Sequence, residues 1–431
     1  MNQIFKQLAP LFIKTAAIRF GGMAFMFATS VVLARALGAR EFGIYGSVMA
    51  IAAILAVPAQ FGLPQLATRQ ISVARVNKDW MRVRATLVWF SVLVFSGSIA
   101  MMALAAVGYH WLPVGYKANH FVAYLWGIAL VPVIAGISLG TGILRGFRCI
   151  VGANLYEGVF RPGLMLLALL VTYFSGQAMN VGSILALQAL CGAAVFFTCM
   201  IHILRILPQP VLAASTQRFE RRLVASAPPM AGTEISRILD GQYAIILLSM
   251  IGQFADVGFF RIALSMAAFI SLPMTLINLV AMTHIAEMHG TGDHAGLQDF
   301  AKVSSLICFT STFFITLGLI FFGKSFLIFL YGAEYKAAWL PLVLIGLAHT
   351  INAFFGSQAI ILNMAGEEKS VLKAFSLMPV IGIVVLLSLF PILGILAAGV
   401  AVIFSYLVQS LILSSRAKSR LHLDTAAFPL L

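Results

Sequence analysis

Long apolar runs recur along the whole chain of 431 residues, and they constrain its fold more than any other feature. Two of the cleanest, 85–107 and 303–323, contain no charged residue. A helix of about 20 mostly apolar residues crosses a bilayer core of about 30 Å. Its backbone N–H and C=O groups form hydrogen bonds with one another, since no water is available there. A membrane β-barrel would instead show alternating segments of about ten residues. The sequence therefore predicts an all-α, polytopic membrane protein.

Twelve such runs can be placed on the chain. Their approximate limits are 10–34, 42–67, 85–107, 121–144, 154–174, 181–204, 223–250, 257–283, 303–323, 337–363, 372–390 and 392–414. The composition agrees, because 61% of the residues are hydrophobic and only 10% are charged, against roughly 45–50% and about 25% in soluble domains. The net charge of +14 is scattered between the runs and forms no patch with interleaved aromatic residues, so no nucleic-acid partner is expected.

The positions of Lys and Arg indicate how the spans are oriented. With the amino terminus inside, the cytoplasmic segments hold 18 of the 28 Lys and Arg, the outer segments hold 5, and 5 lie within the spans. Cytoplasmic loops are enriched in these residues, so both termini are predicted to be cytoplasmic. Lys14 and Arg19 interrupt what would be the apolar region of a signal peptide, and no cleaved signal is expected. The four cysteines show no disulfide or metal-binding spacing.

The two halves of the chain share a pattern. A shift of 215 residues places Gly43 on Gly258 and Pro58 on Pro273, so that the second and eighth spans both read G-x8-AA-x4-P-x9-T. Transporters often arise from such duplications. We therefore predict two pseudo-symmetric six-helix bundles around a central cleft, with corresponding bends at the two prolines. The predicted parts are an N-terminal lobe at 1–207, a cytoplasmic linker at 208–222 and a C-terminal lobe at 223–431.

Eight charged residues fall in the interior of the predicted spans, more than one residue from either end. They are the cations Lys14, Arg19, Arg161, Arg237 and Arg261 and the anions Glu157, Glu234 and Asp240. A charge at mid-bilayer costs about 2.5–3.5 kcal/mol on insertion scales, so these side chains should face a wet cavity or one another. Glu157 and Arg161 are spaced i,i+4, and Glu234 and Arg237 i,i+3, so both pairs could also meet as purely structural ion pairs.

Several cations in one cleft suit an anion that carries more than one charge, because a guanidinium can bind phosphate through two parallel hydrogen bonds. We therefore predict substrate binding by all five cations. For Lys14 and Arg261, snorkelling towards the membrane surface is the alternative. Glu234 and Asp240 are candidate coupling residues for a proton or sodium gradient, and no other cofactor is expected. No P-loop, nucleophile elbow or HExxH motif is present, so neither a catalytic residue nor a metal site is predicted.

Four stretches carry a resemblance to a known family. The best matched is LARALGAREFGIYGSVMAIAAILAVPAQFGLPQLATRQIS at 33–72, and the others are 160–170, 258–273 and 330–369. With them the chain resembles the polysaccharide repeat-unit flippases, the O-antigen-exporter branch of the multidrug/oligosaccharidyl-lipid/polysaccharide exporter superfamily. Arg19 and Arg261 match positions where related lipid flippases carry arginines on the first and eighth helices.

The resemblance implies a function for the chain. It implies alternating access and translocation of undecaprenyl-pyrophosphate-linked oligosaccharides across the bacterial inner membrane for surface polysaccharide, such as O-antigen of lipopolysaccharide. The implied partners are this lipid-linked substrate, membrane lipids, and the polysaccharide polymerase and chain-length machinery. Three alternatives stay open: a multidrug/cation antiporter of the same superfamily, a membrane enzyme such as a glycan polymerase, and a structural partner in glycan assembly.

Overall fold

Helices make up nearly all of the structure. The computed structural model describes residues 2–109, 120–176, 179–213, 227–291, 294–421 and 423–428, and no β-strand occurs in these ranges. The first half contains α1 Asn2–Gln60, α2 Leu63–Val76, α3 Trp80–Gly108, α5 Phe121–Gly146, α6 Ile150–Leu155, the π-helical segment η2 Tyr156–Phe160, α7 Arg161–Phe174, α8 Val181–Ile206 and α9 Gln209–Ala213. The predicted all-α class is confirmed.

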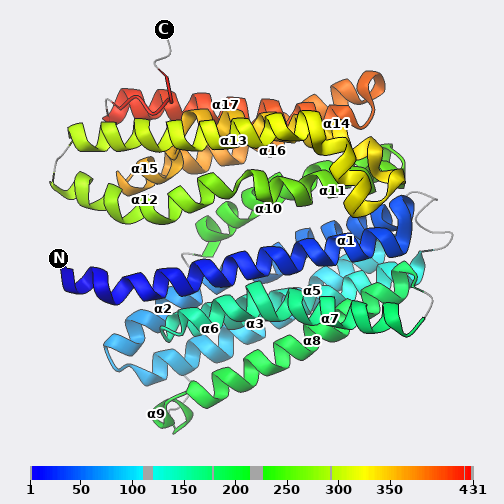
Figure 1. Cartoon of the computed structure of the whole chain (residues 1–431). Coiled ribbons are helices and arrows are strands. Elements are labelled where there is room, and N and C mark those ends of the chain that lie inside the picture. Colours follow the sequence, from blue (N-terminus) through cyan, green and yellow to red (C-terminus); the bar gives the residue numbers. More distant parts are fainter. Residues whose placement is uncertain are drawn as a thin grey trace. The chain divides into compact units, whose positions relative to one another are not determined.

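The second half continues the same pattern (Figure 1). It contains α10 Ala227–Ile251, α11 Phe254–Ile270, α12 Leu272–Thr291, α13 His294–Tyr331, the 3-10 helix η4 Ala333–Ala338, α14 Trp339–Phe355, α15 Gln358–Met364, α16 Glu368–Leu393 and α17 Leu396–Leu421. Where the structure describes them, all twelve predicted spans therefore fall on helical segments.

Local backbone chemistry divides the longest helix. Gly38 interrupts α1 with a φ of 75° and a ψ of 168°, which a residue with a side chain rarely adopts. The helical stretches on its two sides correspond to the first two predicted spans. After Pro58, the second stretch ends at Gln60, where Phe61 and Gly62 also have positive φ.

Most of the predicted spans lie on helices that are long and apolar enough to cross a membrane. Among the described residues, nine helices meet this requirement, and α11 with α12, bent by 44° just before Pro273, forms a tenth span. Dividing α1 at Gly38 gives an eleventh span. The seventh predicted run lies on α10, which is not among the helices that meet the requirement in the described residues. The eighth span thus bends next to its proline, as expected for a residue that cannot donate a helical hydrogen bond.

The chain folds into two compact units. The first comprises Met1–Leu37 and Ile44–Ile238, and the second comprises Gly38–Gly43 and Leu239–Leu431. In the first, α2, α3, α5 and α8 enclose a core that includes Leu66, Phe90 and Val131 (Figure 1). In the second, α14 and α16 pack against α17, and α13 packs against α14. The predicted linker at 208–222 and the lobe limits stay predictions, because 214–222 lie outside the described residues.

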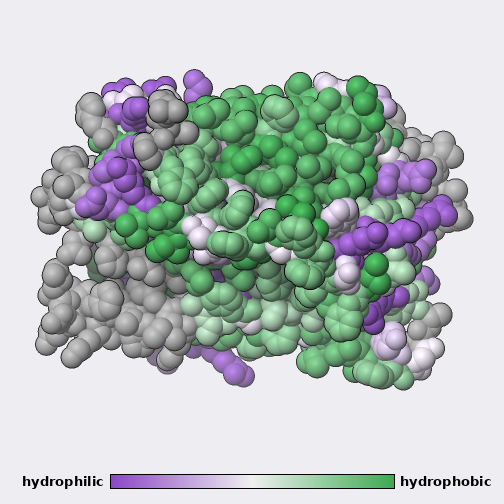
Figure 2. Space-filling model, turned by 45° about the horizontal axis from the view of Figure 1, so that its top comes forward, coloured by the Kyte–Doolittle hydropathy of each residue, from purple (hydrophilic) through white to green (hydrophobic). Residues whose placement is uncertain are grey.

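Large hydrophobic side chains lie on the outside of the helices. Phe95, Phe321, Phe329 and Ile392 are all more than 60% exposed. Figure 2 shows hydrophobic residues over the middle of the visible face and hydrophilic ones gathered towards its two ends. A soluble protein rarely exposes so much apolar surface. The chain is therefore a multi-pass membrane protein, whereas its orientation stays a prediction.

Candidate functional site

The structure describes the side chains of most charged residues that the sequence places in the spans. Those of Lys14 and Arg237 lie outside the described residues, although both positions are helical. The predicted pairing of Glu234 with Arg237 therefore stays a prediction. Arg19, Arg161 and Glu234 belong to the first unit, and Asp240 and Arg261 belong to the second.

A wide helical turn in the first unit positions two of these charges. In η2, the N–H of Arg161 bonds to the carbonyl of Tyr156, five residues earlier. Pro162 follows directly, and it has neither an N–H for the carbonyl of Gly158 nor room beside it in a regular α-helix. A π-helical turn relieves that conflict, and such turns are frequent at functional sites. Glu157 lies within this turn, and Arg161 begins α7 directly after it.

Helix α1 crosses this turn at very close range. A Cβ atom on Gly22 would lie only 2.1 Å from the carbonyl oxygen of Gly158, so only glycine fits at position 22. Ile18 also lies against the turn. A Cβ atom added to Gly158 would be in van der Waals contact with Cγ2 of Ile18, at 3.7 Å. The next residue, Arg19, is exposed and makes no hydrogen bond or ion pair with another residue that the structure describes. The turn of α1 that carries Arg19 thus lies against η2.

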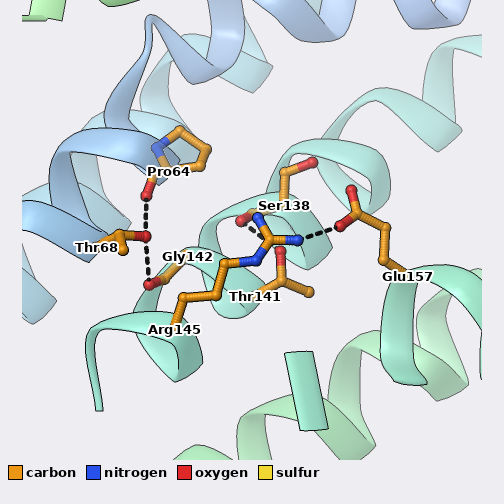
Figure 3. Close-up of polar contacts among 7 residues, drawn as sticks. All are labelled: Pro64, Thr68, Ser138, Thr141, Gly142, Arg145 and Glu157. Carbon is orange, nitrogen blue, oxygen red and sulfur yellow. Dashed lines mark hydrogen bonds and ion pairs between the residues drawn. The ribbon is translucent and has the colours of Figure 1, made fainter. Parts of the chain in front are cut away.

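Glu157 forms its ion pair with Arg145 at the end of α5, with 2.7 Å between a guanidinium nitrogen and a carboxylate oxygen (Figure 3). The spacing left a direct ion pair between Glu157 and Arg161 open as one alternative, and in the structure the ion pair of Glu157 is with Arg145 instead. The end of α5 is held in place by Thr68 of α2, whose hydroxyl donates to the carbonyl of Gly142 at 2.8 Å (Figure 3). The i,i+4 spacing relates residues on the same helix only. It could not reveal that Arg145, on the neighbouring helix α5, would form the ion pair instead.

Arg161 interacts with two neighbouring side chains. It is half-buried and interacts electrostatically with Tyr45 of α1 as well as with Glu157. The hydroxyl of Tyr45 donates to the side-chain oxygen of Gln188 on α8 at 2.5 Å. We call Tyr45, Glu157, Arg161 and Gln188 the Arg161 cluster. Sequence reasoning missed Tyr45 and Gln188. The only available signal was that each is a polar residue within an apolar run, and such residues more often serve helix packing than ligand binding.

In the second unit, Arg261 lies over an aromatic ring. Its guanidinium carbon is 5.8 Å from the centroid of Phe42, a geometry typical of a cation–π contact. Two glycines bring these residues together, because Gly43 and Gly258 let the chain around residues 38–43 pack against the start of α11. A Cβ on Gly43 would lie 1.7 Å from the carbonyl oxygen of Phe254, and one on Gly258 would lie 3.3 Å from the nitrogen of Gly43. The glycines matched by the 215-residue shift are therefore in contact.

The two candidate coupling acids lie in different surroundings. Glu234 accepts a hydrogen bond from the side-chain nitrogen of Gln65 at 3.3 Å, within the first unit. In the second unit, Asp240 interacts electrostatically with Tyr243 of its own helix and with Tyr406 of α17. The ring of Tyr406 lies 5.2 Å from that of His349 on α14. We call Asp240, Tyr243, His349 and Tyr406 the Asp240 cluster. The predicted pair of coupling residues is thus divided between the two units.

Neither cluster has the composition of a transition-metal site. Within the described part of the chain, no group of three or more His, Cys, Asp or Glu residues is close enough to hold a metal ion. The Arg161 cluster offers cationic and hydrogen-bonding groups, which suit an anion with polar substituents. The Asp240 cluster offers one carboxylate among aromatic rings, which suits a cation.

Comparison with solved structures shows which fold this is. Over 95% of this chain and 98% of the other, it is similar to a multidrug resistance MATE family transporter of the MOP superfamily, with a TM-score of 0.78 and 13% identity. It is also similar to the lipid II flippase MurJ, with a TM-score of 0.71 and 12% identity over 94% of this chain and 87% of that chain. The MATE multidrug transporter DinF-BH follows at a TM-score of 0.60 and 14% identity, with 97% of each chain covered. The twelve-helix, two-lobe fold is confirmed.

Sequence comparison adds one family. Residues 12–289 match the model of a family described as polysaccharide biosynthesis protein. This match covers more than half of the chain, including both halves of the predicted repeat pattern. No curated protein sequence matches the chain significantly.

Proposed function

Because the chain belongs to the polysaccharide biosynthesis protein family, we propose that it is a flippase for undecaprenyl-pyrophosphate-linked oligosaccharide repeat units. It would move them across the bacterial cytoplasmic membrane by alternating access, with both termini in the cytoplasm, for surface polysaccharides such as O-antigen. The fold of a transporter supports this proposal, as does the family. We further propose that the exported unit passes to a polysaccharide polymerase and its chain-length machinery.

The charge of Arg161 is the observation that carries the proposal. Arg145 forms the ion pair with the carboxylate of Glu157, and Arg161 itself forms no ion pair with any residue in the described ranges. A cation inside a membrane span is costly unless it serves a ligand or a partner. Arg19 adds a second cation on the turn of α1 that lies against η2. Two arginines can bind a pyrophosphate through several charge-assisted hydrogen bonds.

The other groups of the Arg161 cluster fit the rest of such a substrate. The hydroxyl of Tyr45 and the amide of Gln188 can exchange their mutual hydrogen bond for bonds to sugar hydroxyls. A neutral donor and acceptor beside a cation is the chemistry expected for a sugar attached to a phosphate group. This arrangement supports a lipid-linked saccharide over a simple inorganic anion.

The experiment is complementation of surface-polysaccharide export in a flippase-deficient strain, with the membrane level of each variant quantified. Replacing Arg161 or Arg19 by alanine removes charge-assisted bonds of about 1.5–3 kcal/mol each, which corresponds to roughly a 10- to 150-fold loss of affinity. Lysine should restore part of the export, because it keeps the charge but not the planar fork. Arg416→Ala, at an exposed site on α17, is the matched control. Full export by well-expressed Arg161→Ala and Arg19→Ala proteins would contradict the proposal.

The Asp240 cluster supports a role in coupling. A carboxylate that interacts with Tyr243 and Tyr406 can hold a proton or a sodium ion, and we propose that a gradient of one of them drives the cycle. Asp240→Asn should then abolish the dependence of export on that gradient. The cluster also favours the second candidate function, a multidrug/cation antiporter. If the antiporter is correct, Asp240→Asn abolishes efflux of an organic cation such as ethidium, and Arg161→Ala does not affect it.

A further inference from the structure

A groove opens on the outside of the first unit, away from the Arg161 cluster. It has a volume of about 350 Å³ and is lined by residues of α3, α5 and α8. Its lining includes Ser91 and Phe95 of α3, Gly136 and Gly140 of α5, and Phe196 and Met200 of α8. The surface of the groove is almost entirely apolar.

Small residues create this space. Gly136 and Gly140 let α8 approach α5 closely, because a Cβ atom there would lie 2.6 Å from the ring of Phe196 and 2.8 Å from the sulfur of Cys199. On the other side, α3 lines the groove with the short side chains of Ser91 and Ser98 beside larger ones such as Phe95. Small residues on α5 and α3 therefore border the groove. Helix α8 forms its other wall.

The rim of the groove faces the hydrocarbon of the membrane. Val92 is 50% exposed and Phe95 is 64% exposed, and both belong to the part of α3, 85–107, that contains no charged residue. An occupant must therefore be a hydrocarbon chain. A methylene group is about as large as a water molecule, whose share of liquid volume is about 30 Å³, so the groove holds roughly ten methylene groups. That length fits most of one acyl chain of a phospholipid and only a small part of a long polyprenyl chain.

A cation marks one end of the groove. Arg84 precedes Ser91 by seven residues, which is about two helical turns, so the two side chains share one face of α3 about 10 Å apart along its axis. The guanidinium of Arg84 donates to the carbonyls of Val211 and Leu212 at α9, which fixes it at this end. Those carbonyls do not neutralise its charge, and no carboxylate forms an ion pair with it in the part of the chain that the structure describes.

We propose that this groove binds one acyl chain of an anionic glycerophospholipid, whose phosphate lies at Arg84. The apolar groove and the fixed cation complement the two parts of such a lipid, and their separation matches the short distance between a phosphate and the first methylene groups of its chains. The site is independent of the proposed substrate site, because neither Arg161 nor Arg19 lines it.

Fluorescence quenching by brominated lipids tests this proposal. A Phe196→Trp reporter is reconstituted in phosphatidylcholine vesicles that contain either brominated phosphatidylglycerol or brominated phosphatidylcholine, and the signal of the chain without the reporter is subtracted. A cation near a lipid phosphate contributes about 1 kcal/mol, so we expect about a five-fold preference for phosphatidylglycerol. Equal quenching by the two lipids would overturn the proposal.

Two variants locate the lipid. Arg84→Gln should remove the preference, whereas the matched control Arg205→Gln should keep it, because Arg205 is exposed on the opposite face of α8 from Phe196. Ser91→Phe fills the groove and leaves Arg84 intact, and it should also remove the preference for phosphatidylglycerol. If phenylalanine prevents folding, Ser91→Leu replaces it in the test. A preference that survives both fillings would overturn the proposal. Displacement of brominated phosphatidylglycerol by undecaprenyl phosphate, but not by unlabelled phosphatidylglycerol, would also overturn it and assign the groove to the substrate lipid.

Discussion

Replacing Gln298 by methionine should weaken the attachment of the 423–428 segment to the second unit and lower the free energy of unfolding of that unit. After α17, this segment folds back onto the bundle, where Leu423, Thr425 and Ala426 are buried. Gln298 of α13 binds the backbone of Asp424 twice. Its side-chain nitrogen donates to the carbonyl of Asp424, and its side-chain oxygen accepts from the N–H of Asp424 at 2.8 Å.

The magnitude follows from these two hydrogen bonds. Each contributes about 1 kcal/mol net, so Gln298→Met should cost about 2 kcal/mol. Methionine has a similar length, so little packing is lost. The rest of the segment remains bound, because Ser305 donates to the carbonyl of Thr425 at 2.7 Å and the N–H of Ala427 donates to the carbonyl of Phe354 at 2.8 Å. For a unit of about 150–250 residues, 2 kcal/mol corresponds to a decrease in Tm of roughly 4–8 °C.

Thermal unfolding in detergent, followed by tryptophan fluorescence, measures this decrease. Asp299→Asn is the matched control, since Asp299 is the next residue on α13 and is exposed, and its Tm should not change. The comparison is repeated in a variant that ends after Leu421 and therefore lacks the backbone of Asp424. There Gln298→Met should have little further effect, because its partner is already gone. An equal decrease in both backgrounds would refute the reasoning.

Two further predictions concern helix packing and topology. Gly22→Ala should prevent normal folding of the first unit, because the added carbon would overlap the carbonyl of Gly158, whereas Gly21→Ala has free space and should fold normally, as measured by the yield of monodisperse protein. A cysteine in place of Lys336 should react with an impermeant thiol reagent from outside the cell, and one in place of Lys78 should react only after the membrane is opened. The reverse labelling would invert the predicted orientation.

The helices could be predicted from the sequence because their causes are local. Each apolar run is long enough to span a bilayer, and the residues that interrupt the runs, such as Gly38 and Pro273, act through their own backbone chemistry. The duplication was also readable, because a repeat leaves matched residues at a constant shift. Length, apolar character and backbone restrictions do not depend on which helices become neighbours, so one sequence was sufficient for them.

The positions of the charges in the spans were equally readable, but their partners were not. Spacing along one helix suggested that Glu157 pairs with Arg161, and only the packing of α5 beside η2 brought in Arg145. Tyr45 and Gln188, which complete the Arg161 cluster, come from helices far apart in the sequence. An electrostatic partner is selected by distance in space, and the sequence contains no measure of that distance for residues on different helices.

The matched glycines show where sequence ends and tertiary structure begins. The shift of 215 residues by itself related Gly43 to Gly258, and hydrophobicity by itself determined that both lie in or beside spans. Only the tertiary structure decided that the two glycines touch and that their contact places Phe42 beneath Arg261. The physical reason is that a helix forms through bonds between near neighbours in the chain, whereas a crossing point depends on which backbones can approach without a side chain between them.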